Sequence, residues 1–186
     1  LIFLYINFRI NLNQIMQLNS PLEAFQYWLK KDPNYVFLRQ PVNREFIEYT
    51  YAEADQQIRA MATALHKLGI KPGDHVALLS KNSAHWIMAD LAIMAAGCVS
   101  VPIYPTLAAD SIKDILLHSE SKAVIIGKLD DYSAQQNGIP DIIKIGVDLY
   151  DIKEDHSWEQ LVETHEPINE YPVQKPDDLL TIMYTS

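Results

Sequence analysis

The sequence predicts an α/β fold: a doubly wound, largely parallel sheet with crossover helices, preceded by an N-terminal helix and a β-hairpin. Two short apolar runs, residues 75–80 and 98–103, are bounded by turn residues. Such runs are typical of strands that are buried on both faces. The stretch from Ala84 to Ala96 lies between them, is nearly all apolar and has the length of a helix. Since parallel strands must be joined by a crossover, the three segments predict a strand–helix–strand unit.

Two elements are expected at the start of the chain. A helix is predicted over residues 21–31, because Ser20 and Glu23 have the spacing of a capping box and Pro21 stands at the first helical position, where its missing N–H costs nothing. After this helix, alternating apolar segments predict a hairpin, with strands at residues 35–39 and 46–49 around a turn at 41–44.

The next helix is expected to begin at Tyr51. Thr50 and Glu53 again have the spacing of a capping box, in which each side chain accepts a hydrogen bond from the backbone N–H of the other residue. Gly69 supplies the usual signal for a helix end. The helix has one apolar face to bury, formed by Ala54, Ile58, Met61, Leu65 and Leu68.

The remaining elements alternate in the same way. The loop at residues 104–107 contains Pro105 and follows a strand, at the edge of the sheet where ligands usually bind. Further helices are expected at residues 109–119, at 130–138 and around Trp158, and further strands at 123–126, 142–145 and 179–186.

Composition and charge exclude several classes of function. The formal net charge of −9 disfavours a nucleic-acid-binding protein, because phosphate contacts need clustered Lys and Arg. Cys98 is the only cysteine, so no intrachain disulfide can form, and a reducing, cytoplasmic location is expected. The six histidines lack the spacing of a metal site. His85 and Trp86 open the buried helix, and we expect them to serve packing.

The sequence also lacks the common short motifs of nucleotide-binding and hydrolytic sites. None of G-x-G-x-x-G, G-x-x-x-x-G-K-[ST], H-E-x-x-H and G-x-S-x-G is present. No apolar stretch approaches the roughly 20 residues that span a bilayer. Residues 1–15 precede Met16 and are mostly Leu, Ile, Phe, Tyr and Asn. We expect them to be a non-native or disordered leader; a short docking segment for a membrane surface is the alternative.

Three segments, in the expected order, resemble one enzyme family. Tyr49-Thr50-Tyr51-Ala52-Glu53, the run from Ala95 to Pro102, and Tyr184-Thr185-Ser186 are similar to successive core motifs of the acyl-adenylate-forming (AMP-binding) enzymes. The resemblance covers residues 20–186. The run from Val101 to Thr106 leans toward the long-chain fatty acid–CoA ligase branch.

The resemblance implies a fold, a reaction and a site. Residues 16–186 would be the truncated N-terminal part of an AMP-binding domain, whose parent is an acid–thiol ligase. Tyr184, Thr185 and Ser186 would open the ATP phosphate loop, which in the family continues Gly-Thr-Thr-Gly, one variable residue, Pro-Lys-Gly. No catalytic residue and no metal ligand of the family falls within the chain, so we expect the chain alone to be inactive.

The implied reaction joins a fatty acid to CoA through an acyl-adenylate. ATP, Mg²⁺ and CoA are the implied cofactors and co-substrates of the parent enzyme, and no nucleic acid is an expected partner. Peripheral association with a membrane is left open. Two alternatives also stay open: a non-catalytic α/β binding module, and an adenylate-forming enzyme for another carboxylic acid.

Overall fold

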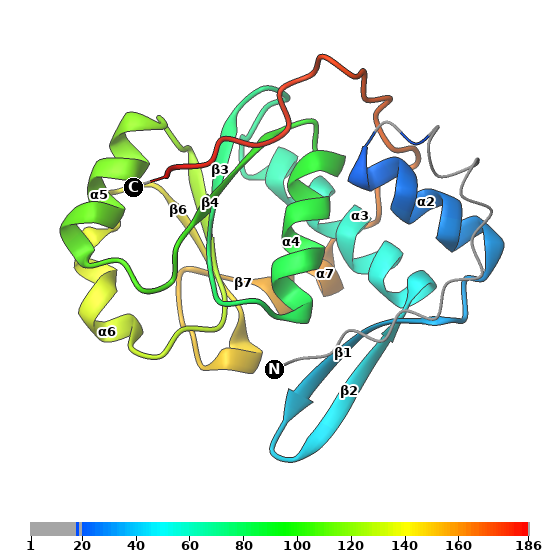
Figure 1. Ribbon diagram of the computed structural model, residues 1–186, viewed down its shortest axis with the longest axis horizontal. Coiled ribbons are helices and arrows are strands. Elements are labelled where there is room, and N and C mark those ends of the chain that lie inside the picture. Colours follow the sequence, from blue (N-terminus) through cyan, green and yellow to red (C-terminus); the bar gives the residue numbers. More distant parts are fainter. Residues whose placement is uncertain (1–17, 19, 186) are drawn as a thin grey trace.

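The computed structural model describes residue 18 and residues 20–185 (Figure 1). The expectations for residues 1–15 and for Ser186 therefore lie outside the described residues. Five parallel strands form the central sheet in the order β4-β3-β5-β6-β7. Their bounds are His75–Leu79 (β3), Val99–Ile103 (β4), Ala123–Ile126 (β5), Ile143–Gly146 (β6) and His156–Ser157 (β7). The predicted parallel sheet is confirmed.

Helices cover both faces of this sheet, as Figure 1 shows. One face packs against α3 (Tyr51–Lys67), α4 (Ala84–Ala95) and α7 (Trp158–Thr164), and the other against α5 (Ala109–His118) and α6 (Tyr132–Gln135).

Strand β3 shows why both faces must be covered. Its side chains alternate: Val76 and Leu78 belong to the core on the α3–α4 side, and Ala77 and Leu79 to the core on the α5 side. All four are buried. Burying a Val or Leu side chain contributes about 1.5–3 kcal/mol, so the two cores together explain the apolar run in the sequence.

Helix α3 has the expected start and end. The Thr50 hydroxyl accepts a hydrogen bond from the Glu53 N–H at 3.2 Å, and the Glu53 carboxylate accepts one from the Thr50 N–H at 2.8 Å. After the helix, Gly69 has a φ of 97°, and the Ile70 N–H reaches the Leu65 carbonyl at 3.0 Å. This is a Schellman turn, in which glycine avoids the strain of a positive φ.

The N-terminal elements also form as expected, with one correction. Helix α2 (Pro21–Lys31) begins at Ser20, whose hydroxyl accepts a hydrogen bond from the Glu23 N–H at 3.1 Å. Strands β1 (Val36–Val42) and β2 (Glu45–Thr50) form a hairpin that projects from the body of the molecule (Figure 1).

The expected four-residue turn of the hairpin is wrong in its bounds. Pro41 and Val42 pair with Phe46 and Glu45 and so belong to the ladder. Asn43 and Arg44 alone form the turn, both with positive φ. Two such residues give the backbone twist that a tight hairpin needs.

Some elements were not expected from the sequence. Strand β7 has only two residues, and two short 3-10 turns occur, η1 (Gln136–Gly138) and η2 (Asp148–Tyr150). The expected helix at 130–138 is correspondingly divided into α6 and η1. Segments of two or three residues are too short for a hydrophobic period to show.

The capping box of α3 can be tested with Thr50→Ala. We expect the free energy of unfolding to fall by about 1 kcal/mol, because the hydroxyl that accepts from the Glu53 N–H and donates to the Glu53 carboxylate is lost, while the backbone N–H of residue 50 is kept. Denaturant unfolding of the 186-residue chain measures this change. Thr106→Ala, at an exposed threonine, is the matched control and should change stability by less than half as much. Equal effects of the two substitutions would contradict the role of the cap.

Candidate functional site

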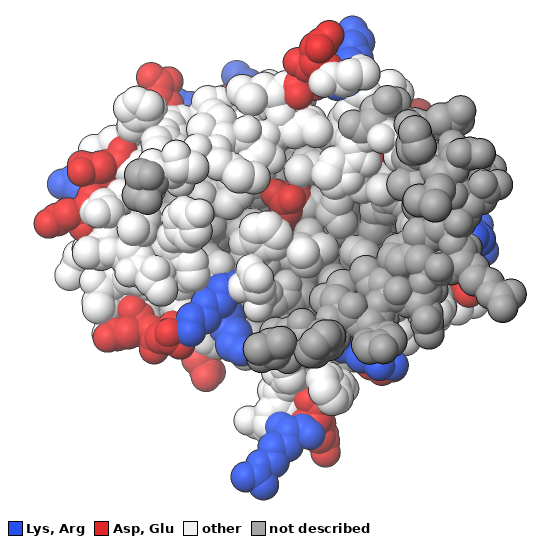
Figure 2. Space-filling view, in the orientation of Figure 1, with Lys and Arg blue, Asp and Glu red and all other residues white. Residues whose placement is uncertain are grey.

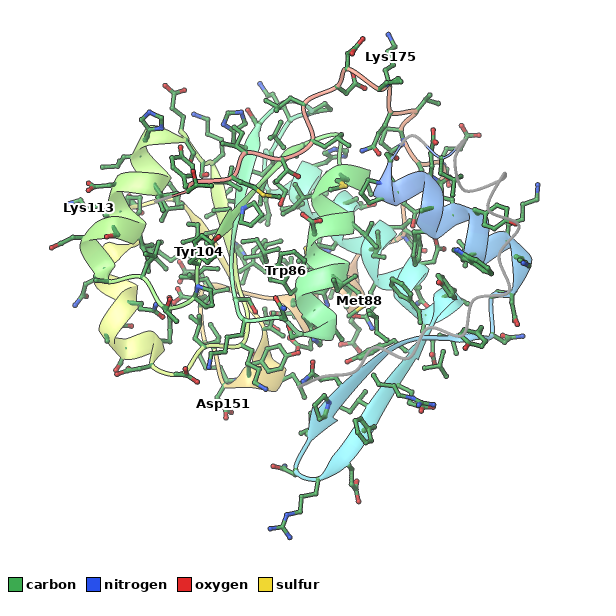
Figure 3. The ribbon with its side chains drawn as sticks, in the orientation of Figure 1. Trp86, Met88, Tyr104, Lys113, Asp151 and Lys175 are labelled. Carbon is green, nitrogen blue, oxygen red and sulfur yellow. The ribbon has the colours of Figure 1, made fainter. Side chains whose placement is uncertain are left out.

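The loop after β4 is braced by a side chain of α6. Tyr104, at its start, is 61% exposed on the face seen in Figure 3. The buried Gln135 side chain donates hydrogen bonds to the carbonyls of Pro105 and Leu107, both at 2.9 Å. The loop at the carboxyl end of β4 is therefore fixed by a residue that sequence reasoning did not identify, because Gln135 lies about 30 positions away.

The C-terminal segment is anchored on the outer edge of β4. The Ser100 N–H donates to the Leu180 carbonyl, and the Ile182 N–H donates to the Ser100 carbonyl, both at 2.9 Å. Thr181 and Ser100 form a single parallel bridge. Two backbone hydrogen bonds thus hold residues 180–182 beside the sheet.

The expected strand at residues 179–186 is wrong, because the pairing stops at this bridge. N–H groups alternate between the two sides of a strand, so the group that would continue the ladder beyond Ser100 belongs to residue 102. That residue is proline and has no N–H to donate. Beyond the bridge the segment leaves the sheet edge, and Met183 is 74% exposed.

Tyr184 lies against the end of α5. Its hydroxyl is 2.7 Å from Nδ1 of His118, and the two rings meet edge to face with centroids 5.7 Å apart. Thr185 is exposed. The structure therefore fixes Tyr184 and leaves the hydroxyl of Thr185 in contact with solvent, while Ser186 lies outside the described residues.

The structure does not bring Tyr184 and the loop after β4 together. Helix α5 begins at Ala109, just after the loop, and ends at His118. A ten-residue helix is about 15 Å long. The loop after β4 and the contact of Tyr184 with His118 thus lie at opposite ends of α5.

Buried polar groups lie beneath the anchored segment. Oδ1 of Asp90 on α4 and Oγ of Ser100 on β4 are both buried and make no hydrogen bond of ordinary geometry within residues 20–185, although the two side chains lie close enough for Ser100 to act on the Asp90 carboxyl. Burial raises the pKa of the Asp90 carboxyl. The surrounding surface is largely uncharged: Figure 2 shows Lys, Arg, Asp and Glu gathered mainly around the rim of this face.

His85 lies inside a cage of aromatic rings. It is 4% exposed, and the rings of Tyr49, Tyr150 and Trp158 meet it edge to face at 5.9, 5.4 and 5.7 Å. Burial lowers the pKa of His85 to about 4, against a raising effect of Glu159. The imidazole is therefore neutral near pH 7, and the packing role expected for His85 is confirmed.

Cys98 is buried as well. Burial and the negative charge of Asp74 raise the pKa of its thiol to about 12, so the reactive thiolate does not form near neutral pH.

Across the part of the chain that the structure describes, no three His, Cys, Asp or Glu side chains gather as metal ligands. No helix within that same part is long and apolar enough to cross a membrane.

Comparisons with known proteins agree on one family. The sequence model described as "AMP-binding enzyme" matches residues 25–186. The long-chain-fatty-acid–CoA ligase FadD15 of Mycobacterium tuberculosis is 36% identical over 104 residues, which cover 56% of this chain and 17% of that protein. Long chain acyl-CoA synthetase 5 of Arabidopsis thaliana is 26% identical over 194 residues, 94% of this chain and 29% of that protein.

Solved structures show the same fold. The anthranilate CoA ligase AuaEII, in complex with anthranoyl-AMP, matches with a TM-score of 0.75 at 19% identity, over 89% of this chain and 31% of that one. A benzoate CoA ligase from Burkholderia xenovorans matches with a TM-score of 0.72 at 19% identity, over 86% of this chain and 31% of that one. The chain thus spans less than a third of the length of these relatives.

The environment of His85 predicts a specific pH dependence of stability. In the unfolded chain the imidazole takes up a proton below pH 6.5, and in the folded chain only near pH 4. Between these values the unfolded state binds more protons than the folded state. The contribution of the neutral His85 to the free energy of unfolding is therefore fully present above pH 6.5 and is lost as the pH falls toward 4. Protonation of His85 can lower the free energy of unfolding by at most about 3 kcal/mol.

The test is unfolding of the chain and of His85→Gln at several pH values in this window. Glutamine keeps a donor toward Tyr150 but cannot be protonated. We expect the stability gap between the two proteins to narrow as the pH falls from 6.5 to 4. A gap that stays constant over the window would show that His85 does not carry this dependence.

Proposed function

The chain belongs to the AMP-binding enzyme family, and on this premise we propose that it is the N-terminal part of a long-chain fatty acid–CoA ligase. The observation that carries the proposal is the family match over residues 25–186, a stretch that contains the segment similar to the start of the family's phosphate loop. Support for a fatty acid comes from the names of the matching long-chain ligases and from the run Val101 to Thr106.

The proposed reaction has two steps. A carboxylate is a poor acyl donor, because its leaving group would be an oxide. It therefore attacks the α-phosphorus of ATP, and acyl-AMP forms as pyrophosphate leaves. The sulfur of CoA then attacks the acyl carbon and expels AMP. The first step concentrates negative charge on phosphate oxygens, which preorganised N–H and O–H donors stabilise.

The chain's own contribution is to hold the start of the phosphate loop. Ser100 fixes residues 180–182 through two backbone hydrogen bonds, and His118 fixes Tyr184. These contacts leave Thr185 exposed. We assign to its hydroxyl a hydrogen bond to a phosphate oxygen of ATP, and to Ser186 the same role at the next position.

Mg²⁺ would neutralise phosphate charge in the intact enzyme. In the resembled family the ligand of this ion lies beyond the start of the phosphate loop, and we propose the same place for it here. The lone, buried Cys98 supports a cytoplasmic location. Peripheral contact with a membrane, from which a long-chain acid would be drawn, is part of the same proposal.

We expect the 186-residue chain alone to show no ATP-dependent activation of an acid. The protein encoded by the complete reading frame should release pyrophosphate with palmitate and ATP, and more slowly with benzoate or acetate. Pyrophosphate release by the 186-residue chain above a no-enzyme control would contradict the assignment of catalysis to a longer protein. Faster release with benzoate than with palmitate would contradict the fatty acid.

The role of Thr185 is tested in the longer protein by Thr185→Val. Losing one hydrogen bond to a charged phosphate should lower kcat/KM for ATP by roughly 10- to 100-fold. Thr164→Val, at an exposed threonine at the end of α7, is the matched control and should leave kcat/KM within about twofold of the unsubstituted protein. Similar losses of kcat/KM in both variants would contradict the proposed hydrogen bond between Thr185 and the phosphate.

A further inference from the structure

A cavity of about 410 Å³ is formed largely by residues of α3 and α7. Three carboxylates line it, those of Glu53, Glu159 and Glu163, together with the side chains of Tyr49 and His85. None of its lining residues is Lys or Arg. The cavity is therefore rich in hydrogen-bond acceptors and carries negative charge.

The hydrogen bonds around His85 determine which of its nitrogens carries the proton. Oε1 of Gln40 accepts from the Ala84 N–H, and Nε2 of Gln40 donates to the Pro41 carbonyl, so the orientation of this amide is fixed. The Tyr150 hydroxyl is 3.0 Å from the same Oε1. Since an amide oxygen only accepts, the Tyr150 hydrogen must point to Gln40.

It follows that the second partner of Tyr150 must be a donor. Nδ1 of His85 lies 3.1 Å from the Tyr150 oxygen and so carries the hydrogen of the neutral ring. The other nitrogen, Nε2, then holds a lone pair. Among residues 20–185 the ring of His85 makes its hydrogen bond through Nδ1, which leaves Nε2 without one; the residue is 96% buried and lines the cavity, and Nε2 is not among the fully buried atoms without a partner, so it stays accessible from the cavity.

Two of the carboxylates are held in place by the fold. Glu53 accepts hydrogen bonds from the N–H and the hydroxyl of Thr50. Glu159 accepts from the N–H groups of Asp148 and Leu149 at 2.9 and 3.1 Å. Glu163 is exposed and has no such bond among the described residues. Two anionic groups are thus fixed in the wall, and a third is free to turn toward a ligand.

We propose that this cavity binds a small organic ammonium ion, which donates an N–H to Nε2 of His85 and pairs with the carboxylates of Glu159 and Glu163. An ammonium group has three hydrogen-bond donors and one positive charge, and it therefore complements a cavity lined by acceptors and carboxylates. A metal ion fits less well, because the acidic and imidazole groups of the described chain do not converge as ligands. The inference does not depend on the proposed ligase activity.

The test uses putrescine, a linear alkyl diamine, as the probe. It is titrated into the isotope-labelled 186-residue chain while the imidazole nitrogen resonances of His85 are recorded. We expect a saturable shift at Nε2 that weakens as salt is added. Butanediol, which has the same chain but no charge, should cause no such shift. A His85 resonance that does not respond to putrescine, or that responds equally to butanediol, overturns the proposal.

A matched pair of surface variants separates the site from general charge. Glu163→Gln and Glu166→Gln each remove one carboxylate from an exposed position near the end of α7, but only Glu163 lines the cavity. Loss of one exposed ion pair should weaken putrescine binding about three- to fivefold in Glu163→Gln and less than twofold in Glu166→Gln. An equal loss of affinity for putrescine in both variants would show that the diamine is attracted by the overall negative charge of the protein, and it would overturn the proposed site.

Discussion

The structure depends on the burial of one strand, β3, on both of its faces. Its inner position between β4 and β5 satisfies its backbone on both sides, and its four apolar side chains supply two separate cores. A parallel strand in this position needs a helical layer above and below. The crossovers α4 and α5 accordingly lie on opposite faces, and α3 and α7 complete one layer while α6 completes the other.

The same constraint limits where the sheet itself can bind a ligand. Its inner strands are covered by helices, so the accessible groups of the sheet lie at its edges. On the edge formed by β4, Ser100 holds the C-terminal segment and Pro102 prevents further pairing. The segment is therefore held over residues 180–182 and then leaves the edge toward α5, where Tyr184 is half-buried and Thr185 is exposed.

Sequence reasoning succeeded where the cause is local and failed where it is distant. The capping box at Thr50 and the glycine turn at Gly69 involve residues within five positions of each other, and both were predicted correctly. His118 and Tyr184 are 66 positions apart in the sequence, and no local pattern predicts their contact. Pro102 can be read directly from the sequence. Whether its missing N–H ends the pairing of the expected final strand depends on which edge of β4 that strand lies against, and this is known only from the structure.

The most direct test of the account is to read the coding sequence immediately after the Ser186 codon. The proposed role of Thr185 requires that a glycine-rich phosphate loop follow it. The account predicts that the reading frame continues as Gly-Thr-Thr-Gly, one variable residue, Pro-Lys-Gly. A stop codon at that point, or a continuation without glycines and lysine, would contradict the proposal that this segment opens an ATP phosphate loop.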